Sequence, residues 1–449
     1  MELDILLLRN PWWKGKENFD EDEDYRKWVS RKIKWVPELT REIALEPFSL
    51  HFIVGARQVG KTTAIKLLIK DMLELEKVNP KSIFYFRCDE ISDYKELKDL
   101  LSSYLELRDS WKIDKSYIFL DEVSFPKEWY RTVKSMIDDG MFKNDVLILT
   151  ASTSIKIKKE TEYFPGRRGK GRDFVVRPLS FREFIKTIDP DLYSKLPQRM
   201  KIFNSKEIEE KALKASIFLS ELNKLLFTYF EVGGFPLSIN SYFESGYMKP
   251  DVKEIYLSWI KNDLIKIGKS INTAREVIKT LLIKIPSTIS WETIAKETSI
   301  KSPKTVNSYL HTFSDMFTCI ISYFLDPSTA TIKFAKNKKV YLQDPLLLSI
   351  FEDWCLIKIK EKEPVVAESV LASHLARVFN EVYHWKNRTE IDCVVRDIEK
   401  VIGFECKWKE KIEKRKIILG KLKEIYILSK KELDVKNKII PLSVFLALI

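Results

Sequence analysis

A glycine-bounded segment near residue 60 constrains this chain more than any other feature of its sequence. The apolar run Phe52-Ile-Val54 leads into the segment, and a helix-patterned stretch follows it from Lys61 onward. Between them the residues have the spacing G-x-x-x-x-G-K-T, which binds phosphate when a strand precedes it and a helix follows it. Glycine lets the backbone turn its N–H groups inward, and the start of the helix adds partial positive charge. The segment therefore predicts a nucleotide-binding loop, although a simple turn before an amphipathic helix has the same outline.

The loop assigns roles to its last residues. In such loops the lysine, here Lys61, reaches the β- and γ-phosphates, and the hydroxyl of the next residue, Thr62, ligates Mg²⁺. We therefore expect ATP and Mg²⁺ as cofactors. The residues predicted to contact the nucleotide are Gly55, Ala56, Arg57, Gln58, Val59, Gly60, Lys61, Thr62 and Thr63.

A second motif lies downstream, where a buried strand ends in two carboxylates. The run Tyr117-Ile-Phe-Leu120 is followed by Asp121 and Glu122, which is the Walker B pattern. At the end of a parallel strand, Asp121 would hold the Mg²⁺ shell and Glu122 would polarise the attacking water. Ion pairs with neighbouring basic residues would also explain two adjacent acids. Alternating strand and helix patterns across residues 46–155 predict a parallel sheet with helices on both faces.

One further apolar run, Val146-Leu-Ile-Leu149, ends in Thr150, Ala151 and Ser152. A glutamate after the Walker B aspartate, together with this extra strand, is similar to the additional-strand ATPases that include the AAA+ group. In that group the polar residue at the end of the strand contacts the γ-phosphate or the water. Thr150 and Ser152 are the candidates for this sensor, and each hydroxyl can equally cap the following segment.

Residues 156–180 are strongly basic and contain a glycine-rich stretch from Pro165 to Gly171. A loop arginine next to a γ-phosphate can act as an arginine finger, and Arg167 is the candidate. Contact with nucleic acid and a solvated surface remain open for these charges. A finger that acts on a neighbouring copy would require an oligomer, and the sequence leaves the oligomeric state open.

Composition sets limits on the possible partners. The net charge of +12 permits binding to DNA, RNA or another polyanion without requiring it. Five scattered cysteines suggest neither disulfides nor a zinc site. No apolar run has the length of a membrane span, so we expect a cytoplasmic protein without a membrane partner. Residues 1–45 carry tryptophans that we expect to pack on the core, with contact to an adenine ring as the alternative.

Several segments follow one shared pattern: Asn10-Pro-Trp-Trp13, residues 54–63, Leu120-Asp-Glu-Val123 with Trp129, Pro165-Gly-Arg167, Pro178-Leu-Ser-Phe-Arg-Glu-Phe184 and Gly233-Gly-Phe-Pro236. In these segments the chain resembles the archaeal and bacterial P-loop ATPases of the AAA-like type that carry a C-terminal domain of unknown function. The resemblance extends over nearly the whole chain and implies a helical lid at residues 181–285. Ala151 departs from the pattern, because that group often has glycine there. The departure affects the sensor assignment and leaves the nucleotide site unchanged.

Residues 286–350 have the pattern of a winged helix. Ser290 caps a short helix, a second helix begins near Lys304, and residues 320–341 read as a β-hairpin. In a DNA reader, Lys301, Lys304 and Asn307 would face the major groove. The lysines that would contact phosphates from the wing are Lys333, Lys336, Lys338 and Lys339. Winged helices also bind proteins, so a protein partner remains open.

Residues 351–449 contain a second group of acids. If a hairpin closes about residues 398 and 399, Asp392 lies opposite Glu405, with their Cβ atoms about 5 Å apart. Two carboxylates that close repel unless a cation lies between them, and Lys407 stands on the same strand face as Glu405. This is the D…E-x-K layout of the restriction-endonuclease-like nucleases, in which Mg²⁺ activates water and the lysine stabilises charge. Glu368, on a helix, would be an additional ligand. The alternative is a polar hairpin in which Lys407 pairs with Glu390.

The fold expected from these patterns is α/β: a P-loop NTPase with an additional-strand parallel sheet, a helical lid, a winged-helix module and a small nuclease-like α/β domain. The last residues, 441–449, read as a closing buried strand. The favoured function is ATP hydrolysis coupled to a C-terminal half that acts on nucleic acid. An ATP-regulated, metal-dependent nuclease and a non-nucleolytic switch ATPase that binds a protein are the alternatives. The expected parts are an N-terminal arm at 1–45, an ATPase domain at 46–180, a lid at 181–285, a winged helix at 286–350 and a nuclease-like domain at 351–449.

Overall fold

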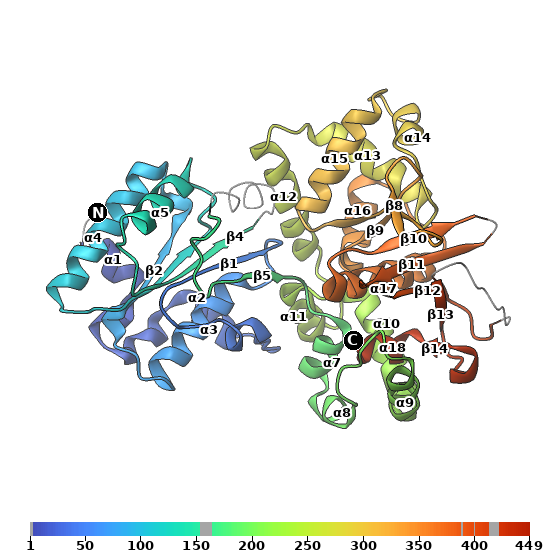
Figure 1. The fold of residues 1–449 in the computed structure, drawn as a ribbon, viewed down its shortest axis with the longest axis horizontal. Coiled ribbons are helices and arrows are strands. Elements are labelled where there is room, and N and C mark those ends of the chain that lie inside the picture. The colour runs from blue at the N-terminus through green and yellow to red at the C-terminus, as the bar shows by residue number, and fades with distance from the viewer. Residues whose placement is uncertain (1–2, 153–163, 388, 399, 413–421) are drawn as a thin grey trace. The chain divides into compact units, whose positions relative to one another are not determined.

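The chain forms two compact units, Met1–Arg177 and Pro178–Ile449 (Figure 1). The structure is a computed structural model that describes residues 3–152, 164–387, 389–398, 400–412 and 422–449. Over these ranges no helix combines the length and the apolar composition that crossing a bilayer requires.

The first unit is built on a five-stranded sheet in which each neighbouring pair of strands is parallel. The strand order is β2-β3-β4-β1-β5, so β4 lies between the strand before the phosphate loop and the strand that ends in the Walker B acids. This position confirms the additional strand of the predicted sheet. The strands are β1 (Ser49–Gly55), β2 (Ile83–Arg87), β3 (Tyr117–Asp121), β4 (Val146–Ala151) and β5 (Asp173–Val176).

Three helices connect these strands: α3 (Lys61–Glu74), α4 (Tyr94–Ser110) and α5 (Trp129–Asp138). The chain crosses in one direction from β1 to β2 through α3 and returns in the other through α4 and α5. Because crossovers between parallel strands are right-handed, α3 covers one face of the sheet, and α4 and α5 cover the other (Figure 1). The predicted covering of both faces is confirmed, and it explains why β1 to β4 are buried along almost their whole length.

The N-terminal arm, which contains α1 (Leu3–Arg9) and α2 (Glu23–Val29), covers the edge of β2. The side chain of Asn10 donates to the backbone carbonyl of Tyr85 at 3.1 Å and accepts from its backbone N–H at 2.7 Å, as a neighbouring strand would. The indole N–H groups of Trp12 and Trp13 both donate to the carbonyl of Ile83, at 3.0 and 2.8 Å. The expectation that these tryptophans pack on the core is confirmed. The arm supplies hydrogen-bond partners for backbone groups of β2, which as an edge strand would otherwise leave them unpaired.

The second unit begins with a run of helices, which agrees with the helical pattern of residues 181–285. Whether these helices act as a lid stays a prediction. They are α7 (Phe181–Ile188), α8 (Pro190–Lys195), α9 (Ser205–Ala215), α10 (Leu219–Val232), α11 (Pro236–Ser245), α12 (Pro250–Lys266) and α13 (Ile271–Lys284).

Residues 286–350 contain the expected pair of helices, α14 (Trp291–Lys296) and α15 (Pro303–Asp315). Ser290 caps α14 by accepting from the backbone of Thr293 at 3.1 Å. The expected single hairpin is divided, because β6 (Cys319–Ser322) pairs with β9 (Lys339–Leu342), while β7 (Phe324–Asp326) and β8 (Thr331–Lys333) form a separate hairpin. The winged-helix assignment therefore stays a prediction.

A seven-stranded sheet forms the centre of the second unit, in the order β14-β13-β12-β11-β10-β7-β8. Because β7 and β8 belong to it, this sheet crosses the predicted boundary at residue 350. The prediction that the chain ends in a strand is wrong, since residues 442–447 are helical. Apart from Ser443 this run is apolar, and a short apolar run has no periodicity that separates strand from helix. The remaining elements are β10 (Tyr383–Lys386), β11 (Glu390–Arg396), β12 (Val401–Lys407), β13 (Leu422–Ser429), β14 (Ile439–Pro441), α16 (Pro345–Cys355), α17 (Lys362–Phe379) and α18 (Leu442–Ala447).

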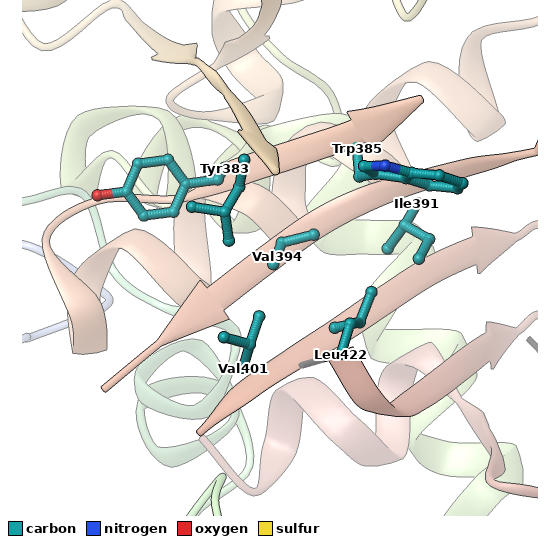
Figure 2. Close-up of a cluster of buried hydrophobic side chains, with 7 residues drawn as sticks. Tyr383, Trp385, Ile391, Val394, Val401 and Leu422 are labelled. Carbon is teal, nitrogen blue, oxygen red and sulfur yellow. The ribbon is translucent and has the colours of Figure 1, made fainter. Parts of the chain in front are cut away.

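One face of this sheet carries an apolar cluster (Figure 2). Its buried members are Leu325, Tyr383, Trp385, Ile391, Val394, Val401 and Leu422. The hairpin of β11 and β12 pairs Cys393 with Phe404 and Val394 with Gly403, which is the register expected from the sequence. The pairing of β10 with β11 is irregular between Ile391 and Val394, which are both in the cluster, whereas the carboxylate of Asp392 lies 2.7 Å from the ammonium of Lys339.

Candidate functional site

The phosphate loop at residues 55–61 adopts the tight turn that its sequence predicts. Gln58 and Gly60 have positive φ angles of 61° and 92°. A Cβ at Gly60 would in addition approach the indole ring of Trp35 to 3.3 Å. Gly55 has a different role, because a Cβ there would lie 2.1 Å from the carbonyl oxygen of Val176 in β5. Gly60 therefore shapes the loop, whereas Gly55 allows β5 to pack against β1.

Lys61 is buried at the start of α3, beneath this turn. Its ammonium group donates to the carbonyl oxygens of Gly55 at 3.0 Å and Ala56 at 2.9 Å. It also lies 3.9 Å from a carboxylate oxygen of Glu122. The lysine thus lies between the phosphate loop and the Walker B glutamate. Its positive charge adds to that of the loop N–H groups and of the helix N-terminus.

The carboxylate of Asp121 is fully buried and accepts hydrogen bonds from three hydroxyl groups. Its Oδ2 atom accepts from Thr62 at 2.6 Å and from the phenol of Tyr85 at 3.2 Å, and its Oδ1 atom accepts from Thr150. The structure therefore brings together Thr62 and Asp121, the two residues that the sequence assigns to Mg²⁺. All three donors are uncharged, so they orient the carboxylate without neutralising it.

Tyr85 is a member of this site that the sequence analysis did not find. It lies on β2, whose position beside β3 follows from the strand order and not from the sequence pattern. Burial, followed by the charge of Asp121, raises the pKa of Tyr85 well above its ordinary value, so the phenol remains a hydrogen-bond donor. The ammonium of Lys66 lies 3.2 Å from the centre of the Tyr85 ring, and Asn10 holds its backbone.

Glu122 follows directly after β3 in the left-handed region, with φ of 55°. Its backbone N–H donates to the hydroxyl of Thr150 at 2.9 Å, so Thr150 contacts both acids of the Walker B pair. The Oε2 atom of Glu122 is buried and lacks a hydrogen-bond partner among the described residues. A buried carboxylate oxygen without a partner fits a site that accepts a water molecule or a metal-bound group. Ser152, the other sensor candidate, is buried just beyond the end of β4.

Arg167 is not brought next to its own phosphate loop. Its guanidinium lies 2.5 Å from Asp138, at the C-terminal end of α5. The following residue, Arg168, accepts a backbone hydrogen bond from Leu50 at the beginning of β1, whereas the phosphate loop follows the end of β1. The structure therefore places Arg167 beside α5, and its assignment as an arginine finger stays a prediction. The basic residues Lys156, Lys158 and Lys159 lie outside the described residues.

The second acidic group is organised around a lysine that the sequence analysis placed on the wing. The ammonium of Lys339 lies 2.7 Å from Asp392, 2.8 Å from Glu390 and 3.1 Å from Glu368, and its side chain is 1% exposed. We call these four residues the Lys339 cluster. The prediction that Lys339 contacts phosphates at the surface is wrong, because β9 directs it inward between α17 and β11.

The other predicted members of the metal site lie beside this cluster. Asp392 accepts from the backbone N–H of Cys406 at 2.8 Å, and the carboxylate of Glu405 pairs with Lys407 at 2.6 Å. Within the described part of the chain, no group of three or more His, Cys, Asp or Glu side chains is arranged to hold a metal ion. The cation expected between Asp392 and Glu405 is not what the structure shows: the ammonium of Lys339 lies beside Asp392, whereas Glu405 pairs with Lys407, and the metal site stays a prediction. The alternative, in which Lys407 pairs with Glu390, is wrong, because Lys407 pairs with Glu405.

The electrostatics of the Lys339 cluster follow from its burial. Burial raises the pKa of Glu368 to about 8, and the charge of Asp392 acts in the same direction. Burial lowers the pKa of Lys339, but the nearby Tyr341 and acidic groups outweigh it and hold the pKa well above its ordinary value. The lysine is therefore charged, and it offsets the acids around it.

The residues proposed for groove contact lie at the surface of the second unit. Lys301 and Lys304 are exposed at the start of α15, and Asn307 is half-buried on the same helix. Lys333 and Lys336 are also exposed, whereas Lys338 lies over the ring of Trp291, 5.5 Å from its centre. The exposed lysines remain available to a polyanionic partner.

Two protein families match separate parts of the chain. The AAA domain family (AAA_14) matches residues 48–185, and a domain of unknown function (DUF8612) matches residues 223–358. With the parallel sheet and the loop described above, residues 48–185 are an AAA-type P-loop domain. No curated protein matches the sequence.

The following solved structures are distantly similar to the chain. A Walker-type ATPase of Pyrococcus abyssi is 13% identical, with a TM-score of 0.38 over 75% of this chain and 97% of that protein. The ORC2 protein of Aeropyrum pernix, in ADPNP–ADP complexes, is 11% identical, with a TM-score of 0.37 over 76% and 94%. The ORC1 protein of Aeropyrum pernix, in complex with DNA, is 11% identical, with a TM-score of 0.32 over 80% and 98%. At these values the similarities carry no argument about activity or partners.

Proposed function

We propose that the first unit binds ATP together with Mg²⁺ and hydrolyses the nucleotide. The observation that carries this proposal is the meeting of Thr62 and Asp121 at 2.6 Å, from the start of α3 and the end of β3. Lys61 and Glu122 lie on either side of them, 3.9 Å apart. Four residues from two separate sequence motifs thus meet at the carboxyl edge of the sheet, where ligands bind in open parallel sheets.

The phosphate loop would bind the triphosphate through its backbone N–H groups and through Lys61. The lysine exchanges its hydrogen bonds to the loop carbonyls for bonds to phosphate oxygens of greater charge. Thr62 and Asp121 would hold Mg²⁺, which neutralises charge on the β- and γ-phosphates when bound. Since the donors to Asp121 are neutral, the full negative charge of this carboxylate remains available to the metal.

Glu122 would orient the water that attacks the γ-phosphorus and would accept its proton. The bond between the γ-phosphorus and the bridging oxygen breaks, and ADP and phosphate leave as products. The hydroxyl oxygen of Thr150 accepts from the backbone N–H of Glu122 and so positions this glutamate. The same hydroxyl group donates its proton to Asp121. The unpartnered Oε2 atom of Glu122 is the oxygen that we assign to the water.

Calorimetric binding of ATP with Mg²⁺ and phosphate release test this proposal. Lys61→Ala should abolish measurable binding. Glu122→Gln should retain binding and slow hydrolysis by about 10²-fold to 10³-fold, the usual cost of one preorganised catalytic group. Lys98→Ala, an exposed lysine on α4, is the matched control and should behave as the parent protein. Unchanged ATP affinity in Lys61→Ala would refute the proposal.

We further propose that the nucleotide state acts on the second unit, and that this unit contacts nucleic acid. The exposed Lys301 and Lys304 at the start of α15 support this choice over a protein partner. In fluorescence anisotropy with duplex DNA, the logarithm of the affinity should fall steeply with the logarithm of salt concentration. Lys301→Glu/Lys304→Glu should flatten the slope, and Lys206→Glu/Lys214→Glu on α9 is the control. A flat slope in the parent protein would favour the protein-binding switch instead.

A further inference from the structure

We infer that Lys339 is the built-in cation of the second acidic group, so that this site fastens β9 to α17 and β11 and takes up no divalent metal. The inference concerns the second unit alone and is independent of the proposed ATP site. It assigns to the nuclease-like arrangement of acids a structural and not a hydrolytic role.

The position of the ammonium supports this inference directly. Its distances of 2.7 Å to Asp392 and 3.1 Å to Glu368 place it between two of the carboxylates that were predicted to hold the metal. A Mg²⁺ ion would lie about 2 Å from the same oxygens and hence within roughly 5 Å of the ammonium. Like charges repel strongly at this separation in a buried site, so the two cations exclude each other.

Several of the other carboxylate oxygens around the cluster also have donors. The second oxygen of Asp392 accepts from the Cys406 N–H, and Glu405 is paired with Lys407. Glu390 receives a second cation, because Lys386 lies 2.8 Å from its other oxygen. These donors hold the neighbouring acids in place around Lys339.

The backbone on both sides of Lys339 is also anchored. In β9, Lys339 pairs with Ser322 of β6, and Tyr341 donates from its hydroxyl to the backbone carbonyl of Asp392. The hydroxyl oxygen of Ser369 in α17 accepts a hydrogen bond from the backbone N–H of Leu342 at 3.3 Å. These bonds hold the backbone from which the Lys339 side chain reaches the cluster. The lysine is therefore part of a joint between two neighbouring segments, the predicted winged helix and the sheet.

Titration of the full-length protein with MnCl₂ alone, without nucleotide, tests the inference by the electron paramagnetic resonance signal of free Mn²⁺. The parent protein and Asp392→Asn should take up the same amount of Mn²⁺. Lys339→Ala should gain one additional ion per chain, and the double variant Lys339→Ala/Asp392→Asn should lose it again. Circular dichroism verifies that each variant is folded.

Two results of the Mn²⁺ titration would overturn the inference. One is an ion bound by the parent protein that Asp392→Asn removes. The other is a folded Lys339→Ala protein that gains no ion. If Lys339→Ala does not fold, the comparison of the parent protein with Asp392→Asn and Glu368→Gln still decides, because neither substitution removes the lysine. Mn²⁺-dependent cleavage of plasmid DNA by the parent protein, abolished in Asp392→Asn, would also contradict it.

Discussion

Asp121 in the first unit and Asp392 in the second are both buried aspartates on sheet strands, and each lies among several hydrogen-bond donors. Around Asp121 the donors are the hydroxyl groups of Thr62, Tyr85 and Thr150. Around Asp392 they are the ammonium of Lys339 and a backbone N–H. Both carboxylates are hydrogen-bonded, but only Asp392 has a charged group among these donors.

This difference separates two ways of stabilising a buried acid. Hydroxyl donors satisfy the lone pairs of Asp121 and leave its charge to attract an external cation. An ammonium satisfies the lone pairs and also neutralises the charge, so no net attraction for a metal remains. The presence of acids at metal-ligand spacing is therefore insufficient to identify a metal site. The charge of their nearest donors decides whether a cation from solution can bind.

The largest expected effect comes from substituting the two aspartates in parallel. Asp121→Asn should lower ATP hydrolysis by about 10³-fold, because the magnesium ligand and its charge are lost. Asp392→Asn should change hydrolysis by less than about twofold, since its charge serves the second unit. Steady-state phosphate release at saturating Mg²⁺ measures both. Equal losses in the two variants would break the comparison.

The next effect is on stability. Lys339→Met should lower the free energy of unfolding by about 3 kcal/mol, because it leaves buried carboxylates without a cation. Lys407→Met is the matched control: this lysine pairs with Glu405 but is half exposed, and its loss should cost less than about 1 kcal/mol. Urea unfolding followed by circular dichroism gives both values. A Lys339→Met protein as stable as the Lys407→Met protein would show that Lys339 does not offset buried charge.

The buried, neutral His374 should make the free energy of unfolding depend on pH, separately from the Lys339 cluster. Burial, with a smaller effect of Arg377, lowers the pKa of His374 to about 3, and its ring accepts from the Phe181 N–H at 2.7 Å. An unfolded histidine binds a proton below about pH 6.5 and the folded one does not, so stability is complete above that pH and is lost as the pH falls. At pH 5 the loss should be about 2 kcal/mol relative to pH 8.

Urea unfolding of the parent protein and of His374→Gln at these two pH values measures this contribution. The variant should lack it, while His311→Gln, an exposed histidine on α15, should retain it. The same pH dependence in His374→Gln would assign the change to the acidic residues instead.

The smallest effect concerns the neutral donors themselves. Tyr85→Phe removes one hydroxyl from Asp121 and should weaken the apparent affinity for Mg²⁺ by about fivefold, or about 1 kcal/mol, with little change in the rate at saturating metal. Tyr104→Phe is a suitable control, because its buried hydroxyl bonds to Ser116 at 3.0 Å and not to Asp121. A lower rate at saturating metal with unchanged Mg²⁺ affinity would contradict the assigned role of Tyr85.

Much of both sites could be read from residues that are near one another in sequence or in a regular pattern. The phosphate loop, the acids after β3 and the extra strand β4 all depend on local spacing, which the chain encodes directly. The register of β11 and β12 was also predictable, since a short turn leaves a hairpin few alternatives. What could not be predicted was Tyr85, Lys339 and the location of Arg167, each of which depends on elements distant in the sequence.

The order of residues by itself therefore determined the nucleotide loop, the parallel sheet around it and the register of β11 and β12. Only the tertiary structure decided which donors surround each aspartate. The reason is physical: backbone periodicity and turn chemistry act over a few residues, whereas the charge that reaches a buried carboxylate depends on which strand lies beside it. A lysine on β9 looks like a surface residue until the packing of β9 against α17 and β11 turns it inward.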